Sequence, residues 1–189
     1  MNEEIKKALS FHKQGKLNEA EKLYLNILSN SPNDPGILQL VGTLYLQKNE
    51  IDLSKEYLIK SLNLDPNNSS TLNNLGNLEK KLGNYDKAIE FFQKNIDRNN
   101  FLASWVNKSN ILIETEKYDE GLQFVRKALK KYPENIKLRS NHAIFLSHCG
   151  FIEECLNIYK QFDEKNLHTN ESYLNYSKIL HKNKFYNQA

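Results

Sequence analysis

The sequence lacks any apolar run of the roughly 18 residues that a membrane-spanning helix needs. Its first sixteen residues also lack the apolar stretch of a secretory signal. We therefore expect no association with a membrane and a cytoplasmic location. Asparagine, lysine and isoleucine are abundant, as is typical of proteins from AT-rich genomes, and we expect a bacterial source.

Glycine and proline are scarce, with seven and four residues among 189, which excludes long flexible linkers. The hydrophobic fraction of 39% is low for a compact domain and fits a thin, elongated core. The 26 basic and 23 acidic residues nearly balance. A nucleic-acid-binding domain would instead carry a clustered basic stripe, so we expect no nucleic-acid partner.

Cysteine is nearly absent, since the chain has only Cys149 and Cys155. Cys155 occupies a slot that small residues fill elsewhere, which favours a buried thiol packed as a small apolar side chain. No feature of the sequence points to an oxidising compartment, so we expect no disulfide. A zinc site built with His142 or His148 is conceivable, but the spacing matches no structural zinc motif. We expect no metal.

Catalytic motifs are missing as well. The chain has no glycine-rich phosphate loop, no H-E-x-x-H helix and no nucleophile elbow. Among its five histidines, His142 falls at a packing position, which favours a hydrogen-bonded interior or boundary histidine over a ligand. His12 and His181 share one position of a repeating pattern but lie far apart along the chain. We therefore expect no enzyme activity, no catalytic residue and no cofactor.

What the chain does contain is one unit copied several times, and residues 69–101 show it best. Apolar residues recur at helical spacing in both halves of this segment, as Leu72, Leu75 and Leu78 and then as Ala88, Phe92 and Ile96. Gly83-Asn84 breaks the pattern between the halves. Two amphipathic helices joined by so short a turn fold back as an antiparallel pair. One pair cannot bury both apolar faces, so it needs neighbours.

Two ladders of small residues show where these neighbours are. The first recurs at steps of 34, 34, 33, 34 and 34 residues: Ala8, Gly42, Gly76, Ser109, Ala143 and Ser177. The second keeps the same steps: Ala20, Ser54, Ala88, Gly121, Cys155 and Ala189. A bulky residue follows the second ladder four places on, and prolines close three of the units at Pro32, Pro66 and Pro133.

This pattern resembles the tetratricopeptide repeat, a helix pair with a period of 34 residues. Leu38, Val41, Gly42 and Tyr45 match its first helix closely, whereas the next repeat has Glu79 in place of the aromatic residue. The resemblance implies an all-α fold, a right-handed superhelical solenoid of antiparallel helix pairs with five full repeats and a truncated sixth. We expect eleven helices in a single domain over 1–189, with repeats at about 1–34, 35–68, 69–101, 102–135, 136–169 and 170–189. Near residue 100 we expect a change of packing angle and no domain boundary.

In this family the first helices line a concave groove. Asparagines recur on that face of the chain: Asn73, Asn74, Asn77, Asn107, Asn110, Asn141 and Asn175. A primary amide can both donate to and accept from a peptide backbone. The row is similar to the asparagine ladder in the repeat region of O-linked N-acetylglucosamine transferase. In the other interpretation, some of these amides only satisfy neighbouring helices. Lysines on or near the same face, including Lys81, Lys137 and Lys178, favour a neutral to acidic partner.

The resemblance implies a protein-interaction scaffold that binds extended polypeptide in this groove. Lysine is absent from the position that clamps chaperone tails in related repeats, so we do not expect that partner. The alternative function is the substrate-presenting region of a larger bacterial glycosyltransferase or sulfotransferase. The last helix carries apolar residues such as Leu174 and Leu180 with no helix after it to cover them. We expect the chain either to fray from about Asn170 or to associate end to end with a second copy.

Overall fold

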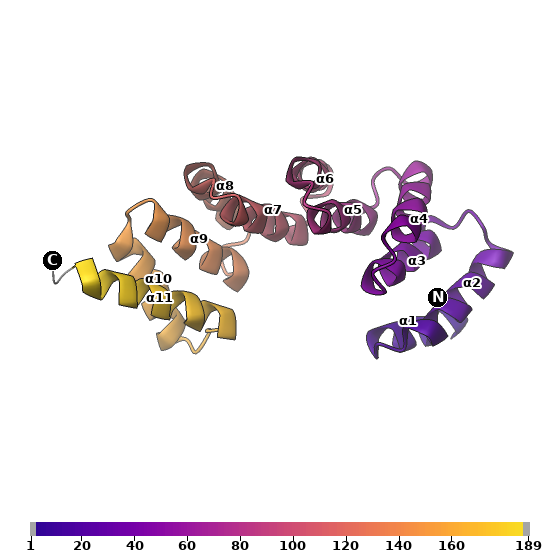
Figure 1. Ribbon diagram of the computed structural model, residues 1–189, viewed down its shortest axis with the longest axis horizontal. Coiled ribbons are helices and arrows are strands. Elements are labelled where there is room, and N and C mark those ends of the chain that lie inside the picture. Colours follow the sequence, from indigo (N-terminus) through magenta and orange to yellow (C-terminus); the bar gives the residue numbers. More distant parts are fainter. Residues whose placement is uncertain (1–2, 187–189) are drawn as a thin grey trace. The chain divides into compact units, whose positions relative to one another are not determined.

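The computed structural model describes the backbone of residues 3–186 and the side chains of 3–170 and 172–181 (Figure 1). Within these residues the chain forms eleven α-helices and no strand, as the sequence predicts. The helices are α1 (Glu3–Lys13), α2 (Leu17–Asn30), α3 (Pro35–Gln47), α4 (Ile51–Leu64), α5 (Ser69–Lys81), α6 (Tyr85–Asn99), α7 (Leu102–Glu114), α8 (Tyr118–Lys131), α9 (Ile136–His148), α10 (Ile152–Glu164) and α11 (Asn170–Tyr186).

Consecutive helices pack as hairpins, α1 on α2, α3 on α4, α5 on α6 and α9 on α10 (Figure 1). The turn inside each repeat contains one residue with positive φ, at intervals of 33 or 34 residues: Gly15, Asn49, Gly83, Glu116 and Gly150. Glycine adopts this conformation without steric cost, and asparagine tolerates it better than most residues. Gly83 lies at the break that the sequence predicts between the paired helices of residues 69–101.

The ladders of small residues mark where paired helices touch. A Cβ atom added at Gly42 would lie 2.6 Å from Leu58 Cγ, and one at Gly76 would lie 2.5 Å from a ring carbon of Phe92. Both distances are too short for a real contact, so a larger residue would push the helices apart. In the second ladder, Cys155 fills the small-residue position of the fifth repeat as a buried free thiol, as expected. Burial raises the pKa of this thiol to about 12.

The helices group into two compact units, Met1–Ser104 and Trp105–Ala189. The division falls in the first turn of α7, next to the shortened connection near residue 100. In the first unit the core is built from buried residues such as Tyr24, Leu44 and Phe92; in the second, Phe145 and Tyr159 fill that role. The single domain and the right-handed superhelix stay predictions.

Polar contacts between neighbouring repeats explain the charged residue at Glu79. One repeat earlier, the Tyr45 hydroxyl donates to Glu21 Oε1 at 2.8 Å, and Lys48 Nζ lies 2.7 Å from Glu21 Oε2. At the next junction the acidic residue lies on the other helix. Glu79 stands at the repeat position of Tyr45, and Lys55 stands at that of Glu21. Lys55 Nζ donates to Glu79 Oε1 at 3.0 Å.

Glu79 is only 3% exposed, so its charge needs these partners. Burial alone would raise the pKa of this carboxyl, but hydrogen bonds from Asn84 and Lys55 outweigh burial and lower the pKa. The departure from the repeat pattern at this position is therefore a paired substitution across a helix junction.

His142 is half-buried on α9 in the second unit, at a packing position of the repeat. Its Nε2 atom is buried and has no hydrogen-bond partner within the described part of the chain, so the expected hydrogen bond is not found there. Burial, followed by the positive charge of Arg126, lowers the pKa of His142 to about 4. The side chain is therefore a neutral imidazole at physiological pH.

Candidate functional site

First helices of successive repeats in the second unit enclose a pocket of about 300 Å³. It lies between α7, α9 and the start of α11, on the face where the family's groove is expected. Eight residues line it: Val106, Asn110, Ile136, Lys137, Ser140, Asn141, Thr169 and Asn170. Two of these, Asn110 and Asn141, belong to the predicted row of asparagines.

Helix capping positions two sides of this pocket. The Asn135 side chain accepts the backbone N–H of Leu138 at 3.0 Å, which starts α9 at the pocket. At α11 the Thr169 hydroxyl accepts the N–H of Ser172 at 3.1 Å, and the Ser172 hydroxyl accepts the N–H of Thr169 at 2.8 Å. These reciprocal bonds are a capping box. Both helices direct the positive ends of their dipoles to this region.

Asn141 joins two repeats at the pocket. Its Nδ2 donates to Ser109 Oγ and to Asn110 Oδ1, both at 2.7 Å. Ser109 donates its own proton to the carbonyl oxygen of Val106 at 2.8 Å, so its Oγ can only accept, which fixes the orientation of the Asn141 amide. The Oδ1 atom of Asn141 accepts no hydrogen bond from any described residue. Among the described residues this oxygen therefore remains available to a donor of a bound molecule.

The pocket carries a small positive charge. Lys137 is exposed and forms no ion pair within the described residues. None of the eight lining residues is an aspartate or glutamate. The walls are apolar at Val106, which is buried, and at Ile136, which is half-buried. A segment that binds here meets an apolar surface, amide groups and one ammonium group.

The other predicted residues are not among those that line this pocket. In the first unit the Asn74 amide donates to Thr43 Oγ1 at 2.6 Å, and Asn73 Oδ1 accepts from Ser104 Oγ at 3.4 Å. Asn77 on α5, Asn107 on α7 and Asn175 on α11 are half-buried, whereas Lys81 and Lys178 are exposed. A continuous row of asparagines across the two units stays a prediction.

Two asparagines of the row match the other interpretation, in which the amides satisfy neighbouring helices. Asn141 is only 7% exposed and its amide is bonded between repeats. Asn74 is likewise bonded to the preceding first helix. The structure also adds pocket residues that the row does not include, Thr169 and Asn170 among them. The T-x-x-S sequence from Thr169 to Ser172 is the signal that would have placed a helix start there.

Within residues 3–186 no helix is both long enough and apolar enough to cross a membrane. Nor do the described side chains bring together three or more histidine, cysteine, aspartate or glutamate residues in a group that would hold a metal ion. The lining of the pocket itself presents amides, one ammonium group and apolar walls.

Comparisons with known proteins agree with the repeat pattern. Models of the tetratricopeptide repeat match residues 8–30, 35–68, 69–100 and 102–135. The anaphase-promoting complex subunit CDC16 of Saccharomyces cerevisiae is 29% identical over 135 residues, which cover 67% of this chain and 16% of the yeast protein. The chain thus spans about a sixth of that relative's length.

Solved structures show the same fold. A tetratricopeptide repeat protein from Parabacteroides merdae superposes with a TM-score of 0.77 at 19% identity, covering 94% of this chain and 71% of that one. PilF of Pseudomonas aeruginosa gives 0.79 at 16% identity, covering 89% and 78%. Because the family models together match well over half of the residues, the chain belongs to the tetratricopeptide repeat family.

Proposed function

We propose that this protein is an interaction scaffold that binds an extended polypeptide along the first helices of its repeats. The observation that carries the proposal is the pocket between α7, α9 and α11, where Asn141 is buried between two repeats and its Oδ1 accepts no hydrogen bond from the described residues. The name of the yeast relative places that protein in a multisubunit assembly, which supports a role in protein binding.

An extended segment presents backbone N–H and C=O groups in alternation. The Oδ1 of Asn141 is positioned to accept one backbone N–H, and the amide groups of Asn110 and Asn170 lie on the same lining. Because such contacts use the backbone, they restrict the partner's sequence only weakly. Each neutral hydrogen bond contributes only about 0.5–1.5 kcal/mol net, so affinity depends on several contacts.

The charge of the lining indicates which segments bind. Lys137 supplies a positive charge, and no carboxylate of the lining opposes it. The starts of α9 and α11 add to the positive potential. The partner segment is therefore neutral to acidic, with an apolar side chain to pack on Val106 and Ile136.

The test is to select peptides from a random phage-displayed library on the purified protein and to measure their affinities by calorimetry. Lys137→Glu reverses the charge at the pocket. Lys130→Glu is the matched control, because Lys130 is an exposed lysine on α8 in the same unit. An exposed ion pair contributes up to about 1 kcal/mol, so Lys137→Glu should weaken acidic peptides about three- to tenfold, reversal being stronger than removal.

The control variant should bind as the wild type does. Equal affinities for both variants and the wild type would show that the peptides bind elsewhere. Selection of mainly basic peptides would contradict the proposed charge preference.

A further inference from the structure

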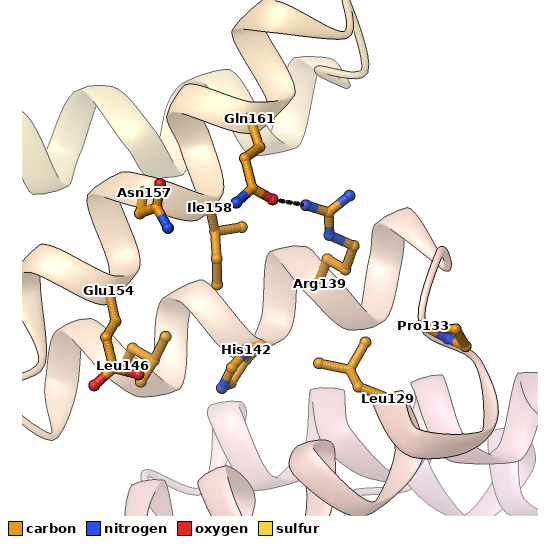
Figure 2. Close-up of a pocket in the computed structure, with 9 residues that line it drawn as sticks. All are labelled: Leu129, Pro133, Arg139, His142, Leu146, Glu154, Asn157, Ile158 and Gln161. Atoms are coloured by element: carbon orange, nitrogen blue, oxygen red, sulfur yellow. Dashed lines mark hydrogen bonds between the residues drawn. The ribbon is translucent and has the colours of Figure 1, made fainter.

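A second pocket of about 300 Å³ lies on the opposite face of α9, between the end of α8 and α10 (Figure 2). Helical geometry turns about 100° per residue, so Arg139, His142 and Leu146 lie on one side of α9. Lys137 and Asn141, which line the candidate groove, lie on the other side. The two pockets are therefore independent sites within one unit.

The preceding repeat shows what fills the corresponding position. There Trp105 stacks on Phe124, with ring centroids 5.0 Å apart and planes 26° from parallel. Residues 34 positions later in the same register are Arg139 and Ile158. Neither is aromatic, and both line the second pocket. The position that an aromatic pair fills in one repeat is thus open in the next.

The walls of the open position suit an aromatic ring. The guanidinium of Arg139 lies 5.0 Å from the centre of the Phe162 ring and donates to Gln161 Oε1 at 2.5 Å, so it is held in place (Figure 2). Its side chain is only 12% exposed. A guanidinium stacks favourably on aromatic rings. Leu146 and Ile158 add apolar surface, as Figure 2 shows.

The far end of the pocket carries a hydrogen-bond acceptor. Glu154 lines it there, and its carboxylate is only loosely paired, 3.8 Å from Arg126. Tryptophan and tyrosine each carry one polar donor on an otherwise apolar ring. A carboxylate at one end and a guanidinium at the other complement such a side chain better than they complement an aliphatic one.

We propose that this pocket binds one aromatic side chain of a partner protein, a tryptophan or tyrosine that stacks against Arg139 and donates to Glu154. This contact lies on the face of α9 opposite to the groove and does not depend on the proposed groove. A partner that uses both faces would hold this repeat from two sides.

The probe is N-acetyl-tryptophanamide, titrated into ¹⁵N-labelled protein and followed by NMR. We expect shifts confined to signals of α9 and α10 that surround the pocket, including the side-chain N–H of Arg139. N-acetyl-leucinamide is the control and should bind about three- to fivefold more weakly, because it lacks the contact with the guanidinium. Binding of both probes with equal affinity, or shifts at the groove residues only, would overturn the proposal.

Two variants fill the pocket in the manner of the preceding repeat. Arg139→Trp and Ile158→Phe each place an aromatic ring where Trp105 and Phe124 stand one repeat earlier, and each should abolish probe binding. Ile158→Phe keeps the contacts of Arg139, so it still tests the site if the Arg139→Trp variant does not fold. Lys137→Glu should leave probe binding unchanged, which separates this site from the groove. Probe binding that survives both filled variants in folded protein would refute the assignment.

Discussion

The pair between Lys55 and Glu79 offers a sharp test of how neighbouring repeats recognise one another. Lys55→Met would remove the ammonium group and leave the carboxylate of Glu79 with Asn84 as its remaining bonded partner among the contacts described above. Breaking a fully buried pair costs about 3–5 kcal/mol. The side chain of Lys55 is 42% exposed, however, so water replaces part of the lost contact. We expect a loss of about 1–2 kcal/mol in the free energy of unfolding.

The charge exchange between junctions makes a stronger experiment possible. Lys55→Glu places two carboxylates together and should cost more than Lys55→Met. Adding Glu79→Tyr to Lys55→Glu recreates the pair that Glu21 and Tyr45 form one repeat earlier. The double variant should therefore be more stable than the sum of the single variants predicts, by about 1–2 kcal/mol, since residues in contact couple on this scale.

Urea unfolding followed by circular dichroism measures all four members of this cycle. Lys60→Glu is the matched control on the same helix, because Lys60 pairs with Glu56 and both side chains are more than half exposed. It should cost no more than about 1 kcal/mol, because it removes one i,i+4 pair and creates a like-charge one. Additive effects of the two substitutions at the junction, within about 0.3 kcal/mol, would refute the account of Glu79 as a paired substitution.

Three further predictions concern the second unit. The pKa of His142 is about 4 in the folded protein and lies below its unfolded value. Its contribution to the free energy of unfolding is therefore present above about pH 6.5 and is lost as the pH falls towards 4. The loss amounts to up to about 3 kcal/mol. His142→Leu should flatten the dependence of unfolding free energy on pH in that window, and parallel curves would contradict this. Asn141→Ala should lower the free energy of urea unfolding by about 1–3 kcal/mol, because it removes two hydrogen bonds between repeats. The same change at the half-buried Asn175 should be nearly neutral. Equal effects of the two substitutions would refute a linking role for Asn141. Leu174 is 55% exposed on α11. If that face pairs two copies of the chain, sedimentation should show concentration-dependent association that Leu174→Lys abolishes, and a monomeric wild type would exclude it.

The helices could be predicted from the sequence because the small-residue ladders fix the contact between paired helices. Gly42 and Gly76 leave no room for a Cβ against Leu58 and Phe92, so the period appears directly in the residues. Three of the turns could be predicted because they carry glycine, Gly15, Gly83 and Gly150, at the residue with positive φ.

The site could be predicted only in part. Periodicity shows which face of α9 carries Asn141, but its burial depends on how closely Ser109 and Asn110 approach from the preceding repeat. The pocket opposite the groove could not be predicted from the sequence. It forms because the side chains of Arg139 and Ile158 leave open the space that an aromatic pair fills one repeat earlier. The expectation of a transferase that presents substrates stays a prediction, since nothing in these residues selects it.

The most direct test of the proposed function is to map a selected peptide on the ¹⁵N-labelled protein by NMR. The groove account predicts that saturating peptide shifts the backbone signals of Val106, Lys137 and Ser140 and the side-chain amide of Asn141. Signals of the outer helices, such as Lys127 on α8, should stay in place. Shifts confined to α8 and α10, with the groove signals unchanged, would contradict the claim that the first helices form the binding surface.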